Sequence, residues 1–171
     1  MRKTRRTLIV FAFVIGAIAL QTTLFDRLRP LDAAPALGVL VVIALARHLA
    51  PEAALITGFG AGLFQDLLSD SVLGIWALSL SVVAFATIRL RDRLVEDITL
   101  IGPAVFGLSL AALALFAVLG TIFGQRTFAD QALVRNMLLP AAYNLVLAIV
   151  VFPLTTWALA PERRTVGGWD L

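Results

Sequence analysis

The chain has 171 residues, of which 60% are hydrophobic and only 15% charged, with a formal net charge of +3. Soluble domains have about a quarter of their residues charged, so this composition excludes an ordinary soluble domain and predicts a single transmembrane domain over residues 1–171. The chain has no cysteine, which excludes disulfides, thiolate metal sites and cysteine nucleophiles. Its basic residues are better explained by membrane topology and lipid contact than by nucleic-acid binding.

Apolar runs of about 20 residues, the length that crosses a bilayer, predict about six transmembrane helices. They lie near residues 7–24, 33–50, 53–68, 72–88, 98–123 and 140–159. The third and fourth are short and are separated only by Ser69, Asp70 and Ser71, which predicts a tight helical hairpin. Other counts stay open: the hairpin could be one re-entrant unit, or the second helix could be lost, which leaves four or five spans.

Two terminal regions need separate interpretation. The N-terminus resembles a secretory signal, with basic residues, an apolar run and Ala17-Ile18-Ala19, but an uncleaved first helix is favoured because more spans follow. Near residues 130–139 we expect a short amphipathic helix on the outer membrane surface, with Asp130 as its N-cap. Pro140 would then begin the last span, and residues 161–171 would form a flexible tail.

The distribution of Lys and Arg predicts the orientation. With the N-terminus in the cytoplasm, ten of the 14 basic residues are cytoplasmic, and Arg27, Arg29, Arg126 and Arg135 are outside. An even number of spans places the C-terminus in the cytoplasm as well. The basic and acidic stretch from Arg89 to Asp97 is then a cytoplasmic loop.

The glycines of the third helix, in the stretch "GFGAGL", do not form a nucleotide-binding loop. The G-x-G-x-x-G spacing is absent, no strand precedes it and no lysine follows it. Gly58 and Gly62 are instead four residues apart, a spacing that allows another helix to approach closely. We therefore predict a helix-packing or partner-binding face at Gly58 and Gly62, with Gly74 beyond the turn.

Asp66 follows one turn after Gly62 on the same helix face. An acid within a membrane is by default a functional hypothesis, a carboxylate that binds a ligand or handles protons. The alternative is structural: Asp66 would accept hydrogen bonds from the following turn or a neighbouring helix and so hold the hairpin. The second alternative is favoured because Asp66 lies near the end of its span.

Asn144 in the last span and Gln21 at the end of the first lie at the same expected depth as Asp66. These three could form one polar cluster in the outer leaflet, or each could be satisfied separately. No nucleophile–base pair, paired acids or histidine cluster is evident, so we expect no enzyme activity, no metal and no cofactor. The single histidine, His48, has no partner ligands nearby in the sequence.

The segment "TGFGAGLFQDLLSDSVLGIWAL" resembles the most characteristic segment of the MreD family of rod shape-determining membrane proteins. The matching positions are Gly58 and Phe59, Gly62 with Asp66 and Leu67, the turn from Ser69 to Ser71, Leu73 with Gly74, and Ala77 with Leu78. The preceding "PALGVLVVIALARHLAPEAAL" is similar to the family's second helix. Asp70 stands where the family often has glycine.

The resemblance implies a non-enzymatic component of the bacterial elongation machinery, in the cytoplasmic membrane, that supports lateral peptidoglycan synthesis. The implied partner is MreC, and through it MreB, RodA and a class B penicillin-binding protein. The implied fold is a compact six-helix bundle similar to the substrate-binding subunit of energy-coupling-factor transporters. A transporter-type subunit that binds a small molecule or lipid is the alternative.

Overall fold

The computed structural model describes residues 2–25, 33–69, 71–96, 98–125 and 133–160, and in these residues it is all-helical. The α-helices in the described residues are α1 (Arg2–Leu20), α3 (Leu37–Ala46), α4 (Pro51–Leu68), α5 (Ile75–Glu96), α6 (Ile101–Ile122) and α7 (Leu133–Leu159). A five-residue π-helical stretch, η1 (Gln21–Phe25), extends α1, and a 3-10 turn, η3 (Ile98–Leu100), precedes α6. The flexible tail predicted for residues 161–171 lies outside the described residues.

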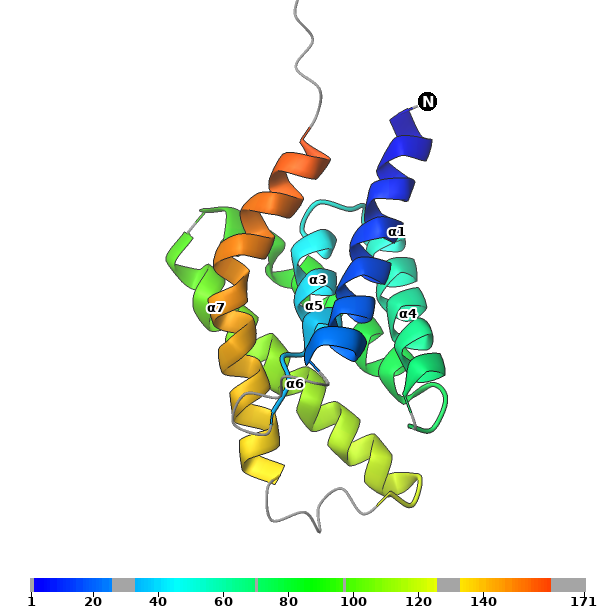
Figure 1. Ribbon diagram of the computed structural model, residues 1–171. Helices are drawn as coiled ribbons and strands as arrows, with labels where there is room; N and C mark the ends of the chain where they lie inside the picture. The colour runs from blue at the N-terminus through cyan, green and yellow to red at the C-terminus, as the bar shows by residue number, and fades with distance from the viewer. Residues whose placement is uncertain (1, 26–32, 70, 97, 126–132, 161–171) are drawn as a thin grey trace, which may run out of the picture.

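The two ends of the molecule differ in what they contain (Figure 1). One end holds the start of α1, the loop between α3 and α4, and the end of α7. The opposite end holds the start of α3, the turn between α4 and α5, and the start of α7. Each end therefore combines segments that are far apart in the sequence, and each carries polar groups described below.

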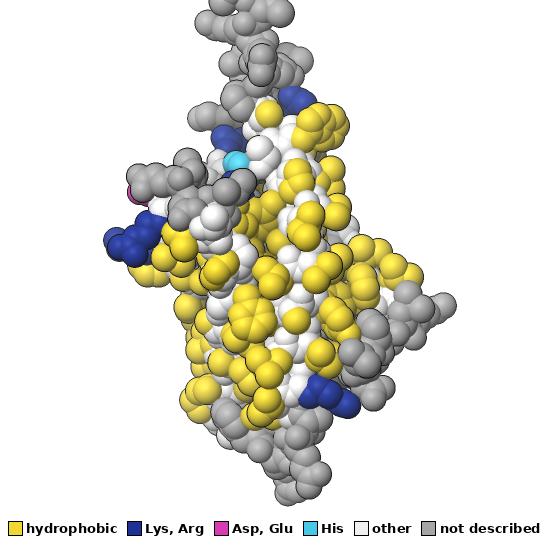
Figure 2. Space-filling model, turned by 90° about the vertical axis from the view of Figure 1, so that its left-hand side faces the viewer, with side chains coloured by type: hydrophobic (Ala, Val, Ile, Leu, Met, Phe, Trp, Pro, Cys, Tyr) yellow, Lys and Arg dark blue, Asp and Glu magenta, His cyan; other side chains and the backbone are white. Residues whose placement is uncertain are grey.

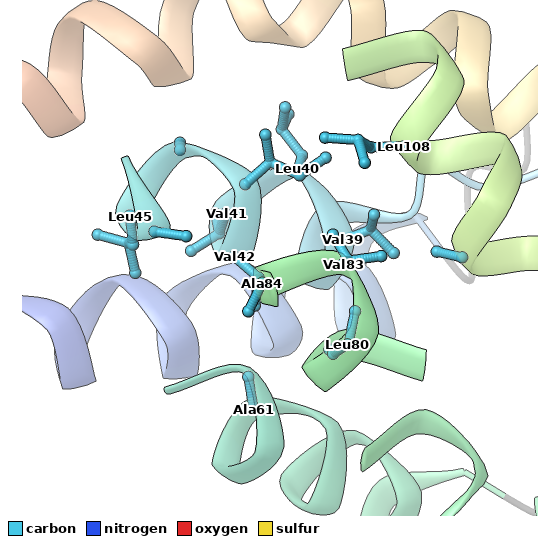
Figure 3. Close-up of a cluster of buried hydrophobic side chains, with 14 of the residues drawn as sticks. Val39, Leu40, Val41, Val42, Leu45, Ala61, Leu80, Val83, Ala84 and Leu108 are labelled. Carbon is cyan, nitrogen blue, oxygen red and sulfur yellow. The ribbon is translucent and has the colours of Figure 1, made fainter. Parts of the chain in front are cut away.

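Helix α3 forms the centre of the core. All ten of its residues are buried, as expected for a helix that is apolar on every side. Figure 3 shows side chains of α3 such as Val39 and Leu45 among residues of α4, α5 and α6 that include Ala61, Leu80 and Leu108. At 1.5 Å per residue this helix is about 15 Å long, half the thickness of a bilayer core, so it is shorter than the span predicted over 33–50.

Three helical segments are long and apolar enough to cross a membrane: Thr4–Phe25, Ile101–Ile122 and Leu133–Leu159. Their outer faces carry large apolar side chains, and Ile149 and Trp157 on α7 are 75% and 79% exposed. Figure 2 shows such side chains covering most of one face of the molecule. A surface of this kind is stable only in a lipid solvent, so the chain is a membrane protein.

Helices α5 and α7 are longer than the sequence predicted. The predicted surface helix near 130–139 is not separate where it is described: from Leu133 it is continuous with the last span, and Pro140 lies inside α7. A proline removes one backbone hydrogen bond, and neighbouring helices tolerate this in membrane proteins, where Pro140 is buried against them. Helix α5 continues to Glu96, so most of the predicted loop from Arg89 is helical.

Candidate functional site

Asp66 is a buried carboxylate, 3% exposed, at the end of α4. Its Oδ1 accepts hydrogen bonds from Ser71 Oγ at 3.1 Å and from the Trp76 N–H at 3.0 Å. Its Oδ2 accepts from the N–H groups of Gly74 at 2.9 Å and Ala77 at 3.1 Å. The first N–H groups of a helix have no partners within that helix, and they carry partial positive charge. Asp66 therefore caps α5 from the preceding helix and closes the hairpin (Figure 1).

Gly74 serves this cap through its backbone and does not pack against another helix. Its φ angle is +101°, a conformation that side chains other than glycine rarely adopt, and no atom lies within 4 Å of where a Cβ would be. That conformation allows its N–H to point at Asp66 while α5 begins one residue later. The prediction of a packing role for Gly74 is corrected accordingly.

Gly58 and Gly62 are buried and face α5 of the same chain. A Cβ on Gly58 would lie 2.7 Å from the Leu80 carbonyl oxygen, and one on Gly62 would overlap the backbone of Trp76 and Ala77. The glycines therefore allow two helix backbones to touch, as predicted from their spacing. The further prediction that this face binds a partner helix is corrected, because α5 already occupies it.

Asn144 and Gln21 both bind the backbone at the start of α3. Asn144 is fully buried, and its Nδ2 donates to the Ala36 carbonyl oxygen and to Ser109 Oγ, both at 3.0 Å. Gln21, the first residue of the π-helical stretch, accepts from the Gly38 N–H through its Oε1 at 3.1 Å. The two amides thus anchor α3 to α7, α6 and the end of α1.

Gln65 is a third amide near the start of α3. It was not predicted from the sequence, because the neighbouring Asp66 gives the stronger signal. It is 4% exposed, and its Oε1 faces Gly38 so closely that a Cβ there would overlap it. Neither Gln65 Oε1 nor Asn144 Oδ1 has a hydrogen-bond partner among the residues that the structure describes. No hydrogen bond in the described residues joins Asp66 to Gln21 or Asn144, so the predicted cluster divides into an amide group on α3 and a separate carboxylate cap.

The opposite end carries a second polar site, which the sequence analysis also missed. We call Arg6, Arg47, His48 and Arg91 the basic loop cluster. Arg6 of α1 donates to the carbonyl oxygen of His48, and Arg91 Nη1 of α5 donates to that of Leu49 at 3.2 Å. Arg6 lies 42 residues before His48, and Arg91 lies 42 residues after Leu49, so only the folded chain brings them together.

Helix α7 forms the remaining side of this cluster. The Arg47 guanidinium lies over the ring of Phe152, 4.7 Å from its centroid. His48 Nε2 lies 3.3 Å from Thr156 Oγ1, which donates its proton to the Phe152 carbonyl oxygen at 2.8 Å. Thr156 therefore lies within hydrogen-bond distance of both the His48 ring and its own helix backbone, and the tautomer of His48 decides which atom of the His48–Thr156 pair is the donor.

The charges of this cluster are not balanced. Burial lowers the pKa of Arg47, and burial together with the positive charges of Arg47 and Arg6 lowers the pKa of His48. Within the described residues neither Arg6 nor Arg47 is paired with a carboxylate, whereas Arg91 Nε lies 3.8 Å from the exposed Asp92. Arg47 Nε is buried and finds no hydrogen-bond partner in the described part of the chain.

The described residues include no group of three His, Cys, Asp or Glu side chains that could hold a metal ion. In comparisons with known proteins, the family model of "rod shape-determining protein MreD" matches residues 1–157. No curated protein and no solved structure matches the chain.

Proposed function

The chain belongs to the MreD family of rod shape-determining proteins, and from this premise we propose that it is a non-enzymatic membrane scaffold that binds MreC. In this role it supports lateral peptidoglycan synthesis and, through MreC, connects to MreB, RodA and a class B penicillin-binding protein. The family match over residues 1–157 carries the proposal. The hydrogen bonds of Asp66 support it, because they hold the α4–α5 hairpin together and assign this carboxylate a structural role.

We place the protein in the bacterial cytoplasmic membrane, with six helices in one compact bundle and both termini in the cytoplasm. The excess of basic residues in the corresponding loops supports this orientation. Figure 1 supports it too, since the start of α1 and the end of α7 lie at the same end of the molecule. A likeness to the substrate-binding subunit of energy-coupling-factor transporters is part of the same proposal.

The MreC helix needs a face that the chain itself leaves open. Among the described glycines inside α-helices, three would place a Cβ in open space: Gly16 on α1, Gly60 on α4 and Gly107 on α6. Each is exposed and stands on a different helix. A partner helix with small residues of its own could approach closely at any of them.

Co-purification of MreC with the tagged full-length chain from membranes tests the proposal. The variants Gly16→Leu, Gly60→Leu and Gly107→Leu should all fold, because each new side chain enters open space. We expect one of them to lower the yield of MreC while the other two serve as matched controls. Failure of the unchanged protein to retain MreC would contradict the scaffold function.

A transporter-type subunit that binds a small molecule or lipid is the second candidate. The observation that favours it is the pair of buried acceptors, Gln65 Oε1 and Asn144 Oδ1, that lack donors. A ligand hydroxyl or ammonium group could supply them, because buried acceptors left unpaired are costly. Native mass spectrometry that finds a small molecule retained by the protein, and lost in Gln65→Leu, would favour this function.

A further inference from the structure

We propose that the basic loop cluster binds the phosphate of an anionic phospholipid headgroup. The proposal does not depend on MreC binding, since it concerns the end of the molecule that holds the α3–α4 loop. It stands on three observations: the convergence of cationic side chains from separate helices, the missing counter-charge, and the position of the loop at the membrane surface.

The convergence is a product of the fold. Arg6 comes from α1 and Arg91 from α5. Each donates a hydrogen bond to a backbone carbonyl oxygen of the loop that carries Arg47 and His48. Figure 2 shows the histidine in cyan with Lys and Arg side chains near it at the upper end of the molecule. Like charges repel, so bringing these cationic side chains together lowers the stability of the fold unless a bound anion supplies the opposite charge.

The missing counter-charge is most evident at Arg47. Its side chain is half-buried over Phe152, and no described residue offers its Nε a hydrogen-bond acceptor. Arginine presents its N–H groups in a planar fork that matches the oxygens of a phosphate. The loop also leads directly into α4, whose N-cap Ala50 offers no side-chain acceptor, so the partial positive charge of this helix end adds to the field.

Glu52 is the carboxylate nearest in sequence on this side. It lies in the first turn of α4 and is exposed. No ion pair in the described residues joins it to Arg6 or Arg47. It therefore leaves the two arginines available to an external anion.

The loop lies at headgroup depth. Thr156, which contacts His48, is followed directly by Trp157, a side chain that is 79% exposed. Tryptophan is enriched where the acyl chains meet the headgroups. Arg6 likewise lies at the beginning of the apolar segment Thr4–Phe25. A phospholipid beside α1 and α7 would present its phosphate at this level.

The test uses the full chain in nanodiscs of phosphatidylcholine, with and without phosphatidylglycerol. Native mass spectrometry measures the retained anionic lipid, and thermal unfolding measures the stabilisation that this lipid causes. Arg47→Gln is the main variant, because no hydrogen bond of the described fold depends on that side chain. We expect it to weaken phosphatidylglycerol binding about five-fold, from the free energy of one basic residue near an anionic surface.

Arg93→Gln is the matched control, since it removes the same charge from an exposed position in the last turn of α5. It should leave the lipid-induced stabilisation unchanged. Arg6→Gln should weaken binding as Arg47→Gln does. Because Arg6 also holds the loop, its effect is measured as the difference in thermal stability between membranes with and without phosphatidylglycerol. Arg47→Lys should restore part of the binding.

A further arm adds inorganic phosphate to the protein in pure phosphatidylcholine. Stabilisation by phosphate as large as that by phosphatidylglycerol would identify a soluble phosphate ligand and overturn the lipid assignment. Equal stability of the unchanged protein in both lipids would overturn the site altogether, as would an Arg47→Gln variant that responds to phosphatidylglycerol like the unchanged protein.

Discussion

The two ends of α4 carry opposite charges, and hydrogen bonds from the chain itself compensate only one of them. At its C-terminal end the carboxylate of Asp66 is buried and receives four hydrogen bonds from its own chain. Just before its N-terminal end, Arg47 and His48 are half-buried with no carboxylate from the described residues to pair with. A compensated charge stabilises the fold, whereas an uncompensated one costs stability until something binds it.

By this difference we assign Asp66 a structural role and propose a binding role for the basic loop cluster. Asp66 is the acid that an intramembrane position would identify as functional. Its oxygens are already used by α5, and Ser69 and Ser71 of the turn bond to each other at 2.7 Å beside it. The basic loop cluster is the less conspicuous of the two sites in the sequence, yet it is the one with unused binding capacity.

The largest effect should come from removing the compensated charge. Asp66→Ala leaves the buried N–H groups of Trp76 and Ala77 without an acceptor and should cost at least about 3 kcal/mol of unfolding free energy. Unfolding in detergent, followed by far-UV circular dichroism, measures the change. Asp92→Asn, at an exposed carboxylate near Arg91, is the control and should change stability by less than about 1 kcal/mol.

An Asp66→Asn variant distinguishes the two interpretations of this residue. If it unfolds more easily, the carboxylate is structural, because an amide cannot accept from both pairs of donors. If it instead keeps the stability of the unchanged protein but no longer retains MreC, Asp66 contacts the partner and the structural interpretation is wrong.

Substituting the glycines of α4 should have the next largest effect on the unfolding free energy, and the two positions should differ. Gly62→Ala places a methyl group into the backbone of α5 and should cost about 1–3 kcal/mol. Gly60→Ala, two residues earlier, faces open space and should be neutral or stabilising by up to about 1 kcal/mol, since alanine is the better helix former. Equal unfolding free energies for the two variants would mean that α4 and α5 are not in backbone contact.

The sequence predicted the first of these regions because its determinants are local. Gly58, Gly62 and Asp66 are spaced by one helical turn, so a single periodic pattern placed them on one face. What the pattern did not reveal is the occupant of that face, since a close-packing surface is the same for a helix of this chain and for a helix of a partner.

The second region was not predicted because its determinants are distant. Arg6 and Arg91 are ordinary basic residues at helix ends, and positive charge near the membrane surface already explained them. Gln65 was missed for a related reason, since an uncharged amide next to an acid gives no signal in hydropathy. Pro140 misled in the opposite direction: proline is common at the first turn of a helix, but α7 accommodates it in its interior.

A smaller effect is expected where the uncompensated charge is removed. In phosphatidylcholine, Arg47→Gln loses its contact with the Phe152 ring but also removes a half-buried charge and its repulsion of Arg6. These contributions oppose each other, so the unfolding free energy should change by less than about 1 kcal/mol. A loss as large as that for Asp66→Ala would show that Arg47 is compensated within the fold, and the contrast between the two ends of α4 would fail.

The smallest effect is a dependence of stability on pH, which comes from His48. Its pKa is lowered below the usual 6.5 by burial, Arg47 and Arg6, so the unfolded chain binds a proton at a higher pH than the folded chain does. Stability is therefore complete above about pH 6.5 and falls as the pH decreases below that value. Thermal unfolding in phosphatidylcholine at pH 7.5 and 5.5 measures the difference, and His48→Gln should reduce it because the chain has no other histidine.

Phosphatidylglycerol should also reduce this pH dependence, since a bound phosphate offsets the positive charge around His48 and brings its pKa closer to the unfolded value. A pH dependence that persists in His48→Gln would assign it to other groups.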